Sequence, residues 1–108
     1  MIPEVTPTEL AAWRADAARA APELVDVREP WEFDYCRIEG SKLVPMGEFA
    51  GRLAELPRDR PLVIVCHHGN RSGVVADYLI RTGFRDVWNL AGGVEAWATD
   101  VDQAMPRY

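Results

Sequence analysis

The segment from Cys66 to Ser72 (CHHGNRS) holds the residues whose types and spacing are best suited to chemistry. A cysteine becomes a nucleophile as its thiolate, and only a few per cent of a free thiol is ionised at neutral pH. Making the thiolate the main form requires about 2.7 kcal/mol of differential stabilisation. A helix dipole contributes about 0.3–1 kcal/mol, whereas each hydrogen bond to a charged group contributes about 1.5–3 kcal/mol. Two or three loop N–H groups aimed at the sulfur would therefore make Cys66 reactive.

Two elements are expected to position this cysteine. The apolar run Leu62–Val65 predicts a short buried strand, and the pattern from about residue 71 to residue 81 predicts a helix. The thiol then lies at the carboxyl end of a strand, where open α/β sheets hold ligands, and faces a helix N-terminus, which favours an anion. Gly69 and Asn70 readily adopt the left-handed backbone that a curled loop needs.

The basic side chains of the loop have several interpretations. Arg71 is a permanent cation, and no Asp or Glu lies between Asp59 and Asp77, which predicts a positive pocket mouth. His67 and His68 fit a general acid or base as well as exposed loop positions. A metal site is not expected, because neighbouring side chains diverge and no distant ligand cluster completes a set.

Three stretches of the chain together resemble the rhodanese-like sulfurtransferases. They are Leu24–Glu29 (LVDVRE), Cys66–Ser72 and Ala91–Trp97 (AGGVEAW), in the order and spacing of that family. In the family the matching cysteine accepts a sulfane sulfur as a persulfide and hands it to a second nucleophile. The resemblance implies that Cys66 is catalytic and that the rest of the loop binds substrate: His67, His68, Gly69, Asn70, Arg71 and Ser72. No metal or organic cofactor is expected, because the transferred sulfur is carried covalently by the cysteine itself.

Asp26 and Arg28 alternate with apolar neighbours at the end of a strand expected over residues 23–27. One interpretation makes them supporting residues that face a polar cleft. The other is an ion pair that fixes the turn into the next helix, and polar pairs at turns favour this second interpretation.

The segment Cys36–Ser41 (CRIEGS) departs from the family pattern. Rhodanese-like domains usually carry a Gly-His-Ile-Pro-Gly-Ala type segment here. Because this chain has no histidine in the segment, the role of the family's histidine is not assigned to any residue. Cys36 is expected to be a half-buried bystander, and a resolving thiol for Cys66 is the less favoured alternative.

Strand and helix patterns alternate along the rest of the chain. Strands are expected over residues 2–5, 23–27, 42–44, 62–65 and 86–90, and helices over residues 7–21, 30–35, 49–56, 71–81 and 94–98. Short turns between them predict an α/β fold, rhodanese-like, with a mostly parallel central sheet of about five strands and helices on both faces. We expect a single domain over residues 1–108. The tail 99–108 has no pattern and is expected along the surface.

Composition excludes several classes of protein. Twelve basic and seventeen acidic residues give a net charge of −5, which argues against nucleic acid as a partner. No apolar run approaches the ~18 residues of a membrane span, and Met1–Glu4 lack the layout of a signal peptide. The two cysteines form no disulfide framework, which favours a reducing cytoplasm.

The primary hypothesis is a sulfurtransferase that moves sulfur from a small anion such as thiosulfate to cyanide, a thiol or a sulfur-carrier protein. A cysteine phosphatase or arsenate reductase is a second hypothesis. Phosphatases resembling this fold place arginine six positions after the cysteine, whereas Arg71 lies five after Cys66 and Ser72 is sixth. The shorter loop predicts a cradle too small for a phosphoryl group. A third hypothesis is a non-catalytic or persulfide-presenting interaction module, although such modules usually lack the cysteine.

Overall fold

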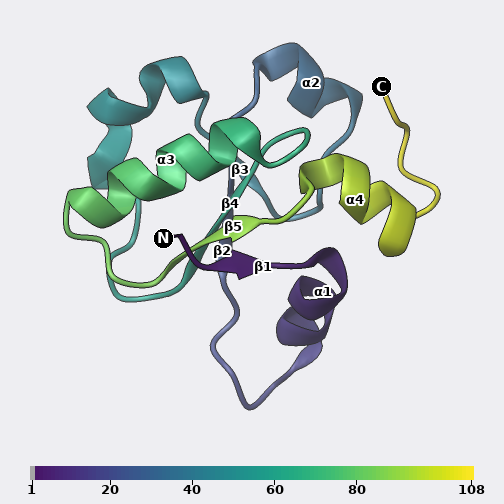
Figure 1. The fold of residues 1–108 in the computed structure, drawn as a ribbon, viewed down its shortest axis with the longest axis horizontal. Coiled ribbons are helices and arrows are strands. Elements are labelled where there is room, and N and C mark those ends of the chain that lie inside the picture. Colours follow the sequence, from purple (N-terminus) through teal and green to yellow (C-terminus); the bar gives the residue numbers. More distant parts are fainter. Residues whose placement is uncertain (1) are drawn as a thin grey trace.

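The computed structural model describes residues 2–108, so Met1, the first residue of the segment Met1–Glu4 discussed above, lies outside it. Strands and helices alternate along the chain, as the sequence predicts (Figure 1). The elements are β1 (Glu4–Val5), α1 (Pro7–Ala15), β2 (Glu23–Asp26), α2 (Pro30–Tyr35), β3 (Lys42–Leu43), the 3₁₀ helix η1 (Met46–Glu55), β4 (Leu62–Val65), α3 (Asn70–Arg81), β5 (Val87–Leu90) and α4 (Gly93–Asp100).

The five strands form one parallel sheet in the order β1-β5-β4-β2-β3. The predicted α/β fold with a sheet of about five strands is thereby confirmed. Strand β4 is central and pairs with β2 through Val25 and Ile64, and with β5 through Ile64 and Asn89. Because parallel strands end at the same edge, the segments that follow β2, β4 and β5 meet there.

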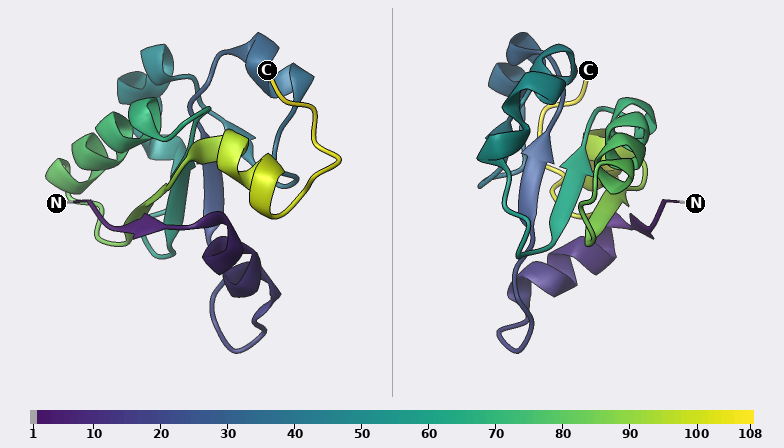
Figure 2. Two further views of the ribbon diagram at one scale, coloured as in Figure 1. Left: turned by 45° about the vertical axis from the view of Figure 1, so that its right-hand side comes forward. Right: turned by 90° about the vertical axis from the view of Figure 1, so that its left-hand side faces the viewer.

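Helices cover both faces of the sheet (Figure 2). Along β4 the side chains alternate, so Val63 and Val65 pack in a core cluster with residues of α1 and α4. Ile64 packs in a second cluster with residues of η1 and α3. Cys66 continues the second set, because it is two residues beyond Ile64 and belongs to the same cluster.

Helix α1 begins as the sequence predicts and ends earlier. Thr6 and Glu9 form the expected capping box, with Pro7 in the first turn. The helix stops at Ala15, and the expected extension to residue 21 is wrong. Asp16 ends it, since its carboxylate accepts the N–H of Ala18 and draws the chain into a turn.

Two further helices differ from expectation. Phe49 and Leu53 lie on a 3₁₀ helix that is broken at Arg52, where φ is −121°, and Leu56 follows its end in extended backbone. In α3, Val75, Ala76 and Leu79 are buried as expected, whereas Ile80 is 37% exposed. Which side chains of a helix are buried depends on the elements that pack against it, and the periodicity of the sequence does not specify those elements.

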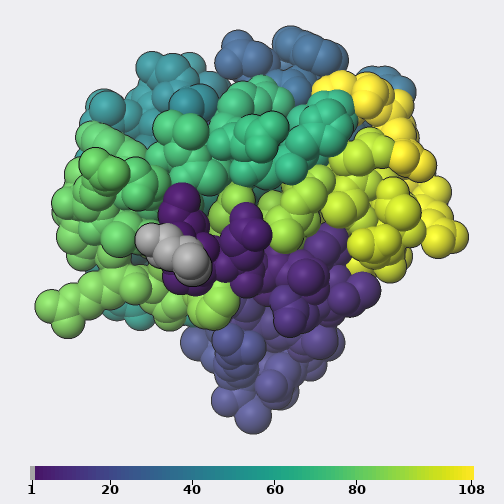
Figure 3. Space-filling model, in the orientation of Figure 1, coloured from purple at the N-terminus to yellow at the C-terminus, as the bar shows by residue number. Residues whose placement is uncertain are grey.

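The C-terminal segment lies along the surface as expected, since every residue from 99 to 108 except Met105 is exposed. Helix α4 continues to Asp100, and Met105 is buried in the cluster of α1 and α4. The chain then runs back to α2, as Figures 1 and 3 show for the yellow segment. No helix within residues 2–108 combines the length and apolar character that crossing a membrane requires.

Candidate active site

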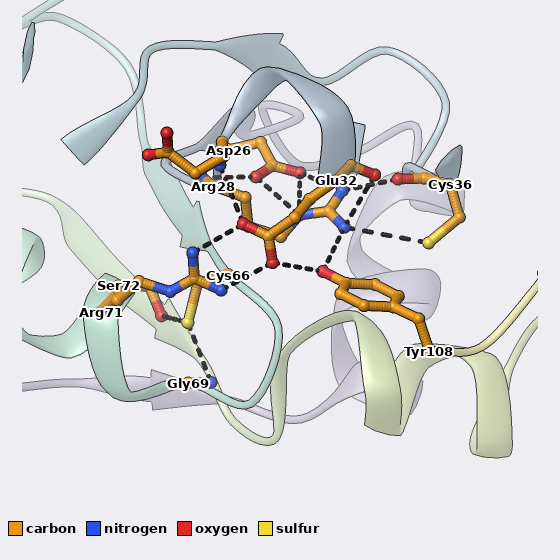
Figure 4. Close-up of polar contacts among 10 residues, drawn as sticks. Asp26, Arg28, Glu32, Cys36, Cys66, Gly69, Arg71, Ser72 and Tyr108 are labelled. Atoms are coloured by element: carbon orange, nitrogen blue, oxygen red, sulfur yellow. Dashed lines mark hydrogen bonds and ion pairs between the residues drawn. The ribbon is translucent and has the colours of Figure 1, made fainter. Parts of the chain in front are cut away.

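Cys66 follows the last residue of β4 and lies under the loop that leads into α3 (Figure 4). Its side chain is buried, with 1% of the residue exposed. The backbone N–H of Gly69 donates to Sγ at 3.0 Å, and the Ser72 hydroxyl oxygen lies 3.2 Å from Sγ. Within residues 2–108 one loop amide therefore bonds the sulfur, where two or three were expected, and a hydroxyl adds a second donor.

The curl of the loop depends on glycine and on α4. Gly69 has φ of +100°, a left-handed conformation that L side chains rarely adopt. The first turn of α4 holds the outer side of the loop, since the N–H of Val94 donates to the Cys66 carbonyl at 2.9 Å and the N–H of Glu95 to the His67 carbonyl at 3.0 Å. Both carbonyls are thereby bonded to α4, while the Gly69 N–H bonds the sulfur.

The loop cation is paired. The Arg71 guanidinium donates to both carboxylate oxygens of Glu32 in α2, at 2.7 and 3.0 Å. This bond is the main reason that the pKa of the Glu32 carboxyl falls to about 2. The expected positive pocket mouth is therefore neutralised by a carboxylate from another element, which local charge counting along the sequence misses.

Asp26 and Arg28 form a fully buried ion pair at 2.7 Å. Arg28 also donates to the carbonyl of Cys36 at 2.6 Å and to that of Glu32 at 3.3 Å. The pair thus ties the end of β2 to the end of α2, which agrees with the turn-fixing interpretation. Cys36 lies on the far side of Glu32 and Tyr108 from Cys66 (Figure 4).

The two histidines stack and do not diverge, so the geometric reason given against a metal site is wrong. Their ring centroids are 3.8 Å apart at 27°. With Glu95 they bring one possible ligand atom each within 4.8 Å of one another, and Glu95 already forms an ion pair with Arg107. Burial is the main reason that the pKa of His67 is lowered, and the neighbouring His68 lowers it further, so the neutral form of His67 is favoured. Asn70, the first residue of α3, is exposed.

Tyr108 belongs to the site although no sequence signal marks it. Its ring stacks on His67 at 3.8 Å between centroids and 13° between planes. Its hydroxyl accepts a bond from Arg28 at 2.9 Å and donates to Glu32 at 2.7 Å. Burial is the main reason that the pKa of Tyr108 rises to about 12.

Asn89 is a second residue that the sequence analysis missed. Its Oδ1 accepts from the Ser72 hydroxyl at 2.5 Å, while its Nδ2 lies 3.0 Å from the Gly69 carbonyl and 3.0 Å from a Glu4 carboxylate oxygen. The signal in the sequence is one polar residue within the otherwise apolar strand β5. In the structure Asn89 is 3% exposed. A buried polar group needs partners, and here two of them, Gly69 and Ser72, belong to the segment Cys66–Ser72, called the active loop below, while Glu4 lies on β1.

A parallel α/β sheet with a cysteine-led loop at the end of its central strand defines the class of this protein. The family model of the rhodanese-like domain matches residues 6–100, and the chain therefore belongs to the rhodanese-like domain family. This places it among the rhodanese-like sulfurtransferases.

Curated relatives and solved structures agree with this assignment. The chain is 38% identical over 93 residues to the thiosulfate sulfurtransferase GlpE of Pseudomonas aeruginosa, covering 86% of this chain and 81% of GlpE. It is 37% identical over 106 residues to the probable adenylyltransferase/sulfurtransferase MoeZ of Mycobacterium tuberculosis, and the match covers 96% of this chain but 26% of MoeZ. The chain thus spans about a quarter of the length of MoeZ. The rhodanese-like domain protein of Staphylococcus aureus superposes with a TM-score of 0.83 at 29% identity, covering 99% of both chains. SSP1007 of Staphylococcus saprophyticus gives 0.83 at 27% identity, covering 98% of this chain and 100% of that one.

Proposed function

We propose that this domain transfers a sulfane sulfur from an anionic donor such as thiosulfate to a thiophilic acceptor through a persulfide on Cys66. The observation that carries the proposal is the pair of donors at Sγ, the Gly69 N–H and the Ser72 hydroxyl. Both can stabilise a negative sulfur, whether it is a thiolate or a persulfide. The GlpE relatives, which are thiosulfate sulfurtransferases, support the choice of donor.

The reaction has two balanced steps. The Cys66 thiolate attacks the outer sulfur of thiosulfate, so a new S–S bond forms while the bond to the sulfite sulfur breaks and sulfite leaves with the electron pair. An acceptor nucleophile then attacks the outer sulfur of the persulfide, and the thiolate of Cys66 leaves. With cyanide as acceptor the product is thiocyanate. A thiol or a sulfur-carrier protein would take the sulfur in the same way.

The remaining loop residues are proposed to bind the donor. Arg71 is 36% exposed at its side chain, so its guanidinium keeps a face for an anionic oxygen while Glu32 holds the other. His67, His68, Gly69, Asn70 and Ser72 would line the approach to Cys66, and Asp26 with Arg28 would support the wall behind them. No cofactor is required by this chemistry, and the two unpaired cysteines support a reducing cytoplasm as the compartment.

The test is mass spectrometry of the intact protein after treatment with thiosulfate. We expect an adduct of about 32 Da, one sulfur atom, that is lost in Cys66→Ser and retained in Cys36→Ser. Thiocyanate formation with cyanide should follow the same pattern. Turnover in the Cys66→Ser variant would contradict the proposal. An unmodified Cys66 combined with hydrolysis of an aryl phosphate would favour phosphatase chemistry instead.

A further inference from the structure

The hydroxyl of Ser72 faces two groups that can each take its proton. Its oxygen lies 2.5 Å from Asn89 Oδ1 and 3.2 Å from Cys66 Sγ. A serine hydroxyl carries one proton, and an amide oxygen is an acceptor only. When Cys66 is a neutral thiol, its own S–H can point to Ser72 while Ser72 donates to Asn89. When Cys66 is a thiolate or a persulfide, the sulfur and Asn89 compete for the single proton.

The amide of Asn89 cannot relieve this competition by turning over. Its Nδ2 donates to the Gly69 carbonyl and to the Glu4 carboxylate, both at 3.0 Å. Each of these partners is an acceptor. Exchanging the amide nitrogen and oxygen would therefore place Oδ1 against two acceptor oxygens, with no proton between them. Oδ1 therefore stays directed at Ser72.

We propose that Asn89 is a positioning residue that sets the ionisation of Cys66 through the proton of Ser72. Its amide oxygen draws that proton away from the sulfur and so favours the resting thiol. Its amide nitrogen holds the carbonyl of Gly69, whose N–H bonds Sγ. The inference deepens the proposed function, since the thiolate it governs is the nucleophile of the proposed transfer.

The charged groups on the elements that pack around the site stay constant in the comparison below. They come from β1, the end of β2, α2, the active loop, α3, α4 and the C-terminal segment: Glu4, Asp26, Arg28, Glu32, His67, His68, Arg71, Glu95 and Tyr108. A change that appears only while Ser72 keeps its hydroxyl cannot come from these groups.

The experiment follows the rate of iodoacetamide alkylation against pH in the full chain, with Cys36→Ser present throughout so that one thiol reacts. Four proteins are compared: the parent, Asn89→Leu, Ser72→Ala and the double variant. We expect Asn89→Leu to move the alkylation profile by about one pH unit towards acid, a tenfold gain in rate below its midpoint. Ser72→Ala should move it towards alkali. In the Ser72→Ala background, Asn89→Leu should produce no acid movement, because no hydroxyl proton is left to compete for; loss of the Nδ2 bond to Gly69 can then move the profile only towards alkali.

A merely structural role for Asn89 would give the same movement in both backgrounds, and that result would overturn the inference. So would no movement, or an alkaline one, in Asn89→Leu. If that variant does not fold, Asn89→Ala, which also removes the amide and leaves every charged group in place, takes its place in the same four-way comparison, with an acid movement expected only while Ser72 is present. Because alkylation needs no sulfur donor, failure of this coupling is distinguishable from failure of the sulfur adduct.

Discussion

At the scale of single residues, the cation of the active loop is held by a buried carboxylate from α2. Glu32 is 4% exposed and receives bonds from Arg71, Tyr108 and its own helix terminus. Removing one partner of such a pair leaves a charge that is poorly solvated. The folding role of Arg71 is therefore inseparable from any role in binding a donor.

Arg71→Ala is expected to lower the free energy of unfolding by about 1–3 kcal/mol, because Glu32 loses its bidentate partner. Urea denaturation measures the change. The matched control is Arg81→Ala in the same helix, whose exposed pair with Asp77 should contribute less than about 0.5 kcal/mol. Equal decreases in the free energy of unfolding in the two variants would contradict the larger contribution expected from the Arg71–Glu32 pair.

The lowered pKa of Glu32, about 2, gives this pair a defined pH dependence. A carboxyl whose pKa is lower in the folded state contributes stability above its unfolded pKa of about 4.3 and loses it as the pH falls towards 2. The unfolding free energies of the parent and of Glu32→Gln should therefore differ most at neutral pH and converge below about pH 3. A difference that stays constant from neutral pH to acid would contradict this assignment.

At the scale of elements, the N-terminus of α4 shapes the active loop from behind. Gly93 has φ of +60°, and a Cβ there would lie 2.3 Å from the Cys66 carbonyl oxygen and 2.4 Å from that of His67. These are backbone atoms, which cannot rotate away as a side chain can. The contact between helix and loop consequently requires glycine.

Gly93→Ala is expected to lower the free energy of unfolding by about 3 kcal/mol or more and to displace the loop, which would reduce sulfur transfer. Thermal unfolding and the thiocyanate assay measure the two effects. Gly47→Ala serves as the control, since a Cβ at Gly47 has nothing within 4 Å. A Gly93→Ala protein with the stability and activity of Gly47→Ala would show that the loop tolerates the added methyl group.

At the scale of the whole molecule, the C-terminal segment returns across the sheet edge to α2 and the active loop. Tyr108 contacts Arg28 just before α2, Glu32 in the first turn of α2, and His67 in the active loop. The segment therefore links elements that sequence order keeps far apart.

The raised pKa of Tyr108, about 12, predicts how this link responds to alkali. A phenol whose pKa is raised by folding contributes stability below its unfolded pKa of about 10 and loses it as the pH rises through about 12. The phenolate absorbance should contain a component near pH 12 that Tyr108→Phe lacks. In that variant the stacked ring is kept, so loss of the late component without loss of folding would isolate the hydroxyl. A parent protein without the late component would contradict the contacts of Tyr108.

Much of the fold was accessible from local patterns. The apolar run Leu62–Val65 predicts the central strand, and Thr6 to Glu9 predicts the capped start of α1, because each depends on neighbours in sequence. The end of α1 and the exposure of Ile80 were predicted wrongly, because they depend on side chains and partners beyond the pattern.

The sequence by itself determined the α/β fold, the parallel sheet and the cysteine at the end of its central strand. Only the tertiary structure decided what surrounds that cysteine: Glu32 on Arg71, Asn89 on Ser72 and Tyr108 on His67. The physical reason is that strand and helix periods are local, whereas partners of buried polar groups are chosen by proximity in space. Each of these three contacts joins residues at least 17 positions apart, beyond the reach of any motif read along the chain.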